Sequence, residues 1–340
     1  MARVDDMTGT GSGAAGERRA GSRVRAVFAR WRGPGARRRG TVLCACAVLL
    51  ALVMVLHRHV PNDIGNLGSL IETFLPWFGL LVPLLAGLAL LRRSPTALVA
   101  ALVPAAVWLN LFGGLVTDKN GPGGDLTVVS HNVNADNPDP EGTARAVAAS
   151  GADVVALVEL KPAMVPVYEE ALAGAYPHHS VRGTVGLWSR HPLDDSRPVD
   201  IRLGWTRAMR ATVSAPGGPV AVYVAHLPSV RVKLHAGFTA NQRDRSADRL
   251  GETIAAEPNR RVILLGDLNG TMNDRSLKAV TSQLRSTQGA AGDGMGFSWP
   301  AGFPMARIDQ ILVRGVEPVA SWSLPRTGSD HLPIAARVTL

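Results

Sequence analysis

Three long apolar segments, separated by short polar stretches, dominate the first 116 residues of the chain. They run from Thr41 to Leu56, roughly from Phe74 to Leu91, and roughly from Ala97 to Val116. A helix needs about 20 apolar residues to cross a bilayer, and the shorter first segment can do so with tilt or local thinning. A cleavable signal peptide is the alternative for the first segment, but two further spans follow it instead of a soluble domain. The pattern therefore predicts three transmembrane helices in residues 41–116.

Beyond residue 125 the pattern changes to short apolar runs that alternate with amphipathic stretches, after a glycine-rich linker at residues 117–125. Period-two and short apolar runs predict strands, whereas apolar residues three and four apart predict helices. We expect strands at Leu126–Asn132, Val154–Leu157, Gly186–Ser189, Arg210–Val213, Val220–Ala225, Arg261–Leu265, Ile308–Val313, Val319–Leu324 and Ile334–Leu340. We expect helices at Glu141–Ser150, Met164–Ala173 and Asn241–Ala256. Two packed sheets flanked by helices are the simplest arrangement for residues 126–340.

The charge is distributed unevenly along the chain. The net charge is +9, of which residues 1–40 carry +7 and residues 125–340 only +1. A domain that grips duplex phosphates usually carries a clear basic surplus, so a nucleic-acid partner is not expected. Residues 1–40 are rich in Gly and Arg and are expected to form a disordered basic tail. The only cysteines, Cys44 and Cys46, lie in the first apolar segment, so residues 126–340 have no disulfide framework.

Arginine clusters predict the orientation in the membrane, because Lys and Arg are enriched on the cytoplasmic side. One cluster, Arg37–Arg39, precedes the first apolar segment, and Arg92-Arg93 follows the second. Both clusters lie on the same side of the membrane if all three segments span it. We therefore expect a multi-pass protein of the cell membrane, with a cytoplasmic N-terminus and residues 126–340 outside the cell.

Polar side chains gather at the ends of the predicted strands, where loops present chemistry on a rigid frame. The clearest case is Gly266-Asp267-Leu268-Asn269 after the apolar run Val262–Leu265, and Gly328-Ser329-Asp330-His331 precedes the last strand. Carboxylates, an amide and an imidazole are the groups that metal-assisted phosphoester hydrolysis requires. Because the set is rich in oxygen and lacks cysteine, it suits Mg²⁺ or Mn²⁺.

Six short motifs, in this order, resemble those of the endonuclease/exonuclease/phosphatase superfamily, whose members include DNase I-like nucleases, sphingomyelinases and inositol-phosphate phosphatases. They are Thr127–Asn134, Ala156–Glu159, Ala225–Leu227, Gly266–Asn269, Arg307–Asp309 and Ser329–His331. The resemblance covers about residues 125–340. It implies an α+β fold, a four-layer α/β/β/α sandwich of the DNase I type, here preceded by three transmembrane helices.

The same resemblance implies a role for each matching residue. It implies metal binding by Glu159, with Asn132 and Asp330 as accessory residues. It implies that Asp267 activates the attacking water, that Asn269 holds the phosphate, and that His226 and His331 face the phosphate. It implies that Asp309 orients His331. Asn134 stands where some members have Asp, so its place in the metal site is in doubt. The roles thus concern Asn132, Asn134, Glu159, His226, Asp267, Asn269, Asp309, Asp330 and His331.

Several other residues have weaker indications. Arg190, Arg207 and Arg210 are candidate phosphate clamps, with solvated or structural roles as the equal alternative. Trp299 can contact substrate or pack in the core, and packing is favoured. His131 is expected at the surface or behind the catalytic groups.

The layout of tail, three spans and outer domain is similar to that of the VanJ-type membrane proteins linked to teicoplanin resistance in actinomycetes. That resemblance implies hydrolysis of undecaprenyl pyrophosphate to the monophosphate, with a lipid phosphate of the outer leaflet as substrate. A membrane-anchored extracellular nuclease or a phospholipid phosphodiesterase of the same superfamily is the alternative. No protein partner is evident from the sequence.

Overall fold

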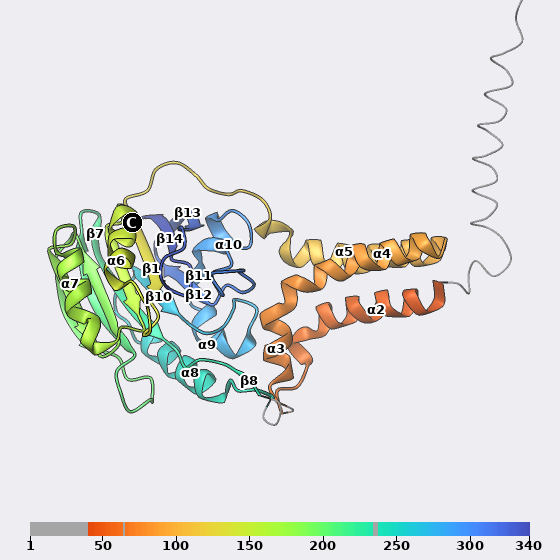
Figure 1. Cartoon of the computed structure of the whole chain (residues 1–340), viewed down its shortest axis with the longest axis horizontal. Helices are drawn as coiled ribbons and strands as arrows, with labels where there is room; N and C mark the ends of the chain where they lie inside the picture. Colours follow the sequence, from red (N-terminus) through yellow and green to blue (C-terminus); the bar gives the residue numbers. More distant parts are fainter. Residues whose placement is uncertain (1–39, 64, 234–236) are drawn as a thin grey trace, which may run out of the picture. The chain divides into compact units, whose positions relative to one another are not determined.

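The computed structural model describes residues 40–63, 65–233 and 237–340, and the predicted basic tail lies almost wholly outside them. The chain divides into two compact units. The first contains residues up to 55 and residues 77–108, and the second contains residues 56–76 and 109–340. Figure 1 shows the helices and strands of each unit along the chain.

Three helical stretches are long and apolar enough to cross a membrane: Thr41–His59, Leu67–Leu91 and Pro95–Leu115. They contain the helices α2 (Thr41–Leu56), α3 (Leu67–Phe74), α4 (Leu81–Leu91) and α5 (Pro95–Phe112), with the 3-10 turns η2 (His57–His59), η3 (Leu75–Leu80) and η4 (Gly113–Leu115). Large apolar side chains such as Leu49, Leu91 and Val99 are exposed on them. Exposed apolar surface of this extent is typical of helices that face lipid. The second stretch begins at Leu67, earlier than the sequence pattern indicated.

The second unit contains two six-stranded sheets of mixed direction. The first sheet has the order β13 (Glu317–Ser323), β14 (Ile334–Thr339), β1 (Leu126–Asn132), β2 (Val154–Val158), β4 (Val185–Ser189) and β3 (His178–Arg182). The second has the order β11 (Arg285–Ser286), β12 (Asp309–Arg314), β10 (Val262–Asp267), β7 (Gly218–His226), β6 (Ala208–Ala215) and β5 (Leu193–Pro198). β1 is parallel to β2 and β10 is parallel to β7, while the other pairs are antiparallel.

Helices cover the outer faces of the two sheets (Figure 1). These helices are α6 (Pro140–Ala149), α7 (Val165–Ala173), α8 (Asn241–Ala255) and α9 (Lys278–Thr281). Helix α10 (Thr287–Ala291) instead contacts both sheets, because the Thr287 hydroxyl donates to the Ile311 carbonyl of β12 and lies 3.3 Å from the Ser321 hydroxyl of β13. The short elements are η5 (Pro162–Met164), η6 (Arg275–Leu277) and the two-stranded β8 (Val232–Lys233) and β9 (Gly237–Phe238).

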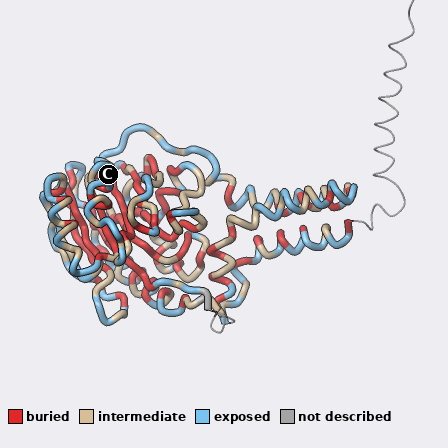
Figure 2. The backbone as a smooth tube through the Cα atoms, in the orientation of Figure 1, coloured by how far each residue is buried: buried red, intermediate tan, exposed pale blue. Residues whose placement is uncertain are grey.

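The core has three apolar clusters, which define the layers. Val128, Leu187 and Val222 pack between the two sheets. Tyr168 of α7 packs on the outer face of the first sheet, and Leu250 of α8 on that of the second. The buried backbone accordingly follows the strands (Figure 2). This arrangement confirms the predicted α+β fold of two packed sheets with helices outside.

All nine predicted strands and all three predicted helices of this unit are present, with ends that differ by a few residues. The pattern did not indicate β3 and β5, which are the outermost strands of their sheets. Both are rich in polar side chains and are only partly buried. An edge strand has little apolar periodicity to reveal it, because much of its surface faces water.

A buried acid, Glu72 of α3, joins two parts of the second unit. Glu72 is fully buried, and its carboxylate accepts a hydrogen bond from the backbone N–H of Arg275 at 3.0 Å. His57 Nδ1 lies 3.3 Å from the same carboxylate, and the hydroxyl of Thr271 donates to the Glu72 carbonyl oxygen. The Arg275 guanidinium also donates to the carbonyl oxygens of Arg58 and Val60. Residues 57–73 are thereby fixed to the η6 region.

Replacing Glu72 with alanine is expected to destabilise the protein by roughly 1–3 kcal/mol, because it leaves a buried backbone N–H without an acceptor. Thermal unfolding of the full chain in detergent measures this change. Glu141→Ala is the matched control, since Glu141 pairs with Arg145 at a site where both side chains are 62% exposed. Exposed pairs contribute about 0–1 kcal/mol, so equal losses in the two variants would contradict the expectation.

Candidate active site

The two sheets bring their polar strand ends together at one edge. In the second sheet, Asp267 lies opposite His226 in the parallel pair β7–β10 and opposite Asp309 in the antiparallel pair β10–β12. In the first sheet, Asn132 ends β1 and Glu159 directly follows the neighbouring β2. Strand register alone therefore places five of the predicted site residues in two short rows that face each other.

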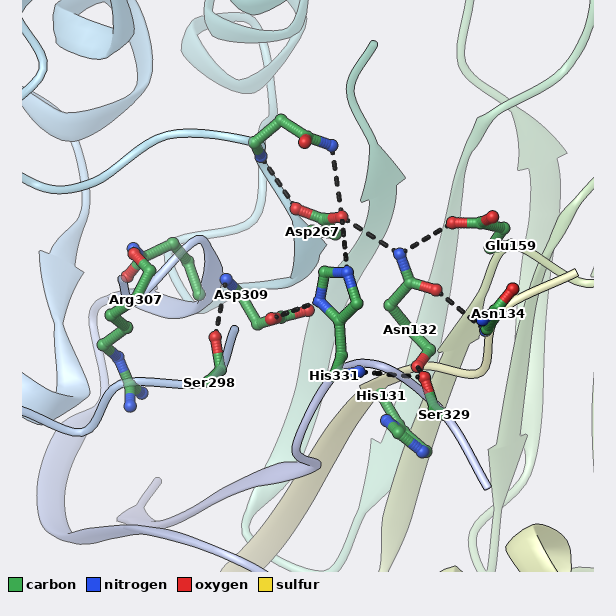
Figure 3. Close-up of polar contacts among 12 residues, drawn as sticks. His131, Asn132, Asn134, Glu159, Asp267, Ser298, Arg307, Asp309, Ser329 and His331 are labelled. Carbon is green, nitrogen blue, oxygen red and sulfur yellow. Dashed lines mark hydrogen bonds and ion pairs between the residues drawn. The ribbon is translucent and has the colours of Figure 1, made fainter. Parts of the chain in front are cut away.

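Asn132 connects the two rows. Its side-chain N–H group donates to Glu159 Oε2 at 2.9 Å and to Asp267 Oδ2 at 3.0 Å (Figure 3). The orientation of this amide is fixed, because the backbone N–H of Asn134 donates to its Oδ1 at 3.0 Å. The two carboxylates thus lie on either side of one amide group.

Asp267 is the central residue of the cluster and is almost completely buried. It accepts hydrogen bonds from the backbone N–H of Asn269 at 2.8 Å and from the Asn269 side chain at 3.1 Å. Burial, together with the nearby charge of Asp309, raises the pKa of Asp267 to about 7 despite these donors. A carboxyl group with a pKa near neutrality can accept a proton under ordinary conditions, as a general base must.

His331 and Asp309 form a buried pair. His331 Nδ1 lies 2.8 Å from Asp309 Oδ2, and its Nε2 lies 3.9 Å from Asp267 Oδ2 (Figure 3). Burial opposes the charge of this imidazole, but Asp309 outweighs burial and raises the pKa of His331 to about 10. The ring is therefore a cation at neutral pH. Its Nδ1–H donates to Asp309 and its Nε2–H is directed at the site.

His226 has the opposite electrostatic character. It is 3% exposed, and neither ring nitrogen has a hydrogen-bond partner among the described residues. Burial, and then the positive charges of Arg207 and His331, hold its pKa well below the ordinary value. Its Nε2 lies 3.7 Å from Glu159 and 3.8 Å from Asp267, so a neutral imidazole faces both carboxylates.

Backbone conformation at the strand ends is unusual. Glu159, Asn134 and Asn269 all have positive φ, at 63°, 60° and 47°. Asn tolerates this left-handed region, whereas Glu seldom adopts it. Strain of this kind persists where the surrounding structure imposes it, and such residues cluster at functional sites. At Glu159 the conformation turns the carboxylate toward Asn132 directly after the strand.

Two predicted metal residues lie at the margin of the cluster. The Asn134 amide oxygen accepts a hydrogen bond from the backbone N–H of Asp136, so it is engaged in its own turn. Asp330 is exposed at the rim of the catalytic pocket and contributes to the raised pKa of His331. The structure brings together the other seven predicted site residues.

The donor set fits a divalent cation. Ligand atoms of Asp267, Asp309 and His331 lie within 4.8 Å of one another, and Glu159 lies across Asn132 from Asp267. Carboxylate and amide oxygens are the ligands that hard divalent ions prefer. Asp309 and His331 are already paired with each other, and Asn132 directs its N–H group at the two carboxylates. Glu159 and Asp267 are therefore the residues that would hold the ion.

A pocket of about 480 Å³ opens above this cluster. Besides the site residues it is lined by Thr73 and Phe74 of α3, by Ser229–Arg231, and by Trp299, Ala306 and Ile308. Thr73 and Phe74 belong to the second apolar stretch. No pattern of residues indicated these two as pocket residues, because their place at the pocket depends on packing between segments about 200 residues apart.

The structure gives contacts for Ser329, which was not predicted as a site residue, and for the three arginines that were candidate phosphate clamps. The Ser329 hydroxyl donates to the backbone carbonyl of Asn132 at 2.7 Å and accepts from the His331 N–H, which ties the last loop to β1. Arg210 pairs with Glu257, and Arg190 with Asp153, so both have structural roles. Arg207 interacts electrostatically with Asp267 and Glu159 and remains a candidate phosphate contact.

His131 is completely buried, with Nε2 at 2.9 Å from the Thr327 hydroxyl. Burial lowers the pKa of His131 to about 3, so the ring is neutral. Trp299, for which packing was favoured, lines the pocket.

Three solved structures illustrate the likeness of this fold to known proteins. An endonuclease/exonuclease/phosphatase family protein of Bacteroides thetaiotaomicron is 18% identical, with a TM-score of 0.52 over 63% of this chain and 94% of that one. A mannosyl-6-phosphatase of the same organism is 18% identical, with a TM-score of 0.51 over 63% and 100%. D. rerio TDP2, complexed with single-strand DNA product, is 21% identical, with a TM-score of 0.52 over 63% and 99%.

No curated protein matches the sequence significantly. The sequence profile of the Endonuclease/Exonuclease/phosphatase family, however, matches residues 129–331, which include every predicted site residue. The profile spans more than half of the chain, and its ends fall on β1 and on His331. The chain therefore belongs to the endonuclease/exonuclease/phosphatase family and is a hydrolase that acts on phosphoesters.

Proposed function

We propose that this protein is a membrane-anchored hydrolase of lipid pyrophosphates at the outer leaflet, with undecaprenyl pyrophosphate as its substrate and the monophosphate as its product. One observation carries the proposal. The catalytic pocket is lined by Thr73 and Phe74, which lie within an apolar stretch long enough to span a membrane. A pocket built in part from such a stretch is held where lipid head groups are, and tethering raises their effective concentration.

The reaction is a hydrolysis: a bond forms between a water oxygen and the terminal phosphorus, and the bond from that phosphorus to the bridging oxygen breaks. The water oxygen attacks the terminal phosphorus, and Asp267, whose pKa is about 7, accepts the proton that the water loses. The P–O bond to the bridging oxygen breaks, and that oxygen leaves with the electron pair as part of the lipid monophosphate. The cationic His331 donates a hydrogen bond or proton to the oxygen on which negative charge develops.

The neighbouring side chains orient Asp267 and His331. Asn132 and Asn269 hold the Asp267 carboxylate from two sides, and Asn269 lines the same pocket. Asp309 orients the His331 ring and keeps it charged. Mg²⁺ or Mn²⁺, held by Glu159 and Asp267, would offset the charge of the phosphoryl oxygens.

The charge distribution favours a lipid over a nucleic acid. Residues 125–340 carry a net charge of only +1, and a nuclease needs positive charge along its DNA-binding face. We further propose that the N-terminus is cytoplasmic, since the arginine clusters flank the first two spans on one side, and that the catalytic unit is extracellular. Recycling of a cell-wall lipid carrier there is consistent with a contribution to teicoplanin resistance.

A phosphate-release assay with the full chain in detergent tests the proposal against its alternatives. Undecaprenyl pyrophosphate is expected to release phosphate in the presence of Mg²⁺, while plasmid DNA stays intact and phospholipids are not cleaved. EDTA is expected to stop the reaction, and added Mg²⁺ or Mn²⁺ to restore it. Nicking of DNA without phosphate release from the lipid would overturn the proposal in favour of a nuclease, and cleavage of phospholipid alone in favour of a phosphodiesterase.

A further inference from the structure

A second cavity, of about 210 Å³, lies next to the catalytic pocket and is mainly apolar. Its apolar lining comes from Pro76, Leu115, Met272, Met295 and Phe297. All of its lining residues belong to the catalytic unit. Methionine and aromatic side chains suit a flexible hydrocarbon ligand, because they adapt to irregular apolar shapes.

The cavity is a direct neighbour of the catalytic pocket. Thr73 lines both. The chain segment before β12 separates them, with Ala306 and Ile308 facing the catalytic pocket and Arg307 lining the apolar cavity. Figure 3 shows the Arg307 side chain directed away from Asp267 and His331.

Arg307 gives the apolar cavity a buried cation. Its side chain is 7% exposed, and only Nη1 has an acceptor, the Gly296 carbonyl oxygen at 2.8 Å. Its Nε and Nη2 have no hydrogen-bond partner, and no carboxylate pairs with it among the described residues. Burial lowers the pKa of Arg307 to about 10, so it is still charged at neutral pH. An unpaired buried cation is costly, and an anionic oxygen would remove that cost.

The position of the cavity in the sequence points to the membrane as the source of its ligand. Pro76 lies within the second apolar stretch and Leu115 is the last residue of the third. Chain connectivity therefore places the cavity at the ends of two predicted spans, where a lipid has its head group and the first part of its chain.

We propose that this cavity binds the first isoprenoid units of the lipid pyrophosphate, while Arg307 holds anionic oxygens of the phosphate that remains on the lipid. The inference rests on the proposed function and adds to it a site for chain recognition. In this arrangement the terminal phosphate lies at Asp267 and His331 and the retained phosphate lies at Arg307, with Thr73 lining both cavities. Burial of the chain then contributes to substrate binding.

Gly289 provides a matched pair of variants, because it lines the cavity and a Cβ there meets only Ser286 at ordinary contact distance, 3.6 Å. Gly289→Phe fills the cavity, whereas Gly289→Ala adds one methyl group. The measurement is kcat/KM for a long-chain relative to a short-chain isoprenyl pyrophosphate. We expect this ratio to fall about tenfold in Gly289→Phe, equivalent to roughly two buried methylene groups, and to stay within about twofold in Gly289→Ala.

Arg307→Gln tests the anionic contact, with the exposed Arg245→Gln on α8 as its control. Arg307→Gln is expected to raise KM for both pyrophosphates about tenfold, because one charge-assisted contact is lost, with a smaller effect on kcat. Thermal unfolding establishes that each variant is folded. If the wild-type protein hydrolyses the long-chain lipid but Gly289→Phe keeps the wild-type chain-length ratio, the cavity assignment is overturned and the proposed function stands. If the wild-type protein does not hydrolyse the lipid, both are overturned.

Discussion

Asp267→Asn is expected to reduce kcat by roughly 1,000-fold or more, at the upper end of the range for the loss of a general base. The Asp267 carboxylate, at the end of β10, accepts hydrogen bonds from Asn132 of the first sheet and from Asn269, and it faces both histidines. An asparagine has nearly the same shape but cannot accept a proton from water. Phosphate release from the lipid substrate under saturating Mg²⁺ measures the effect.

The exposed Asp248→Asn on α8 is the control for a change of charge at the surface. Circular dichroism and thermal unfolding should show that both variants keep the fold, since Asp267 lies at a strand end and not among the apolar clusters of the core. Substantial turnover by a folded Asp267→Asn protein would show that another group accepts the proton.

Asp267→Asn is also expected to change how the stability of the metal-free protein, kept in EDTA, depends on pH. The folded protein raises the pKa of Asp267 to about 7 from 3.8. Between these values the folded state binds more protons at this group than the unfolded state does, so stability falls as the pH rises through this range. The melting temperature of the wild-type protein is expected to fall between pH 4 and pH 7, and Asp267→Asn to show a smaller fall. Equal pH dependence in the two proteins would contradict the raised pKa.

Much of this site could be predicted because its residues follow apolar strands. Asn132, Glu159, His226 and Asp267 each end or follow a buried strand, and strand order brings such ends to one edge. The family resemblance then supplied roles that register alone does not give. The protonation states could not be predicted, since His226 is neutral and His331 is a cation only because His331 pairs with a buried carboxylate and His226 does not.

Other features depend on contacts that local sequence does not encode. Thr73 and Phe74 lie in an apolar run that predicts a membrane span, and nothing in the run indicates that they line a catalytic pocket. Arg307 belongs to a recognised motif, but its burial beside an apolar cavity follows from residues far along the chain, such as Pro76 and Leu115. Such placements require the packed structure.

The pairing of His331 with Asp309 leads to the second large effect. Asp309→Asn is expected to lower kcat/KM by roughly 100- to 10,000-fold at pH 8, because the amide cannot stabilise the imidazolium and no longer fixes its tautomer. In the wild-type protein Asp309 raises the pKa of His331 to about 10. Without that carboxylate burial dominates, and the pKa of His331 should fall toward or below its ordinary value of 6.5.

The change should be visible in the pH dependence of kcat/KM. If His331 acts as a cation, the wild-type activity persists until the pH approaches 10 and is then lost, whereas Asp309→Asn loses its residual activity near neutral pH. The ratio of wild-type kcat/KM to that of Asp309→Asn is therefore expected to be smaller at pH 6 than at pH 9. His226 shows the effect of burial on an imidazole that has no carboxylate partner within hydrogen-bonding distance, since its pKa lies well below the ordinary value. If kcat/KM of Asp309→Asn is still lost only near pH 10, the loss of activity at high pH is caused by a group other than His331.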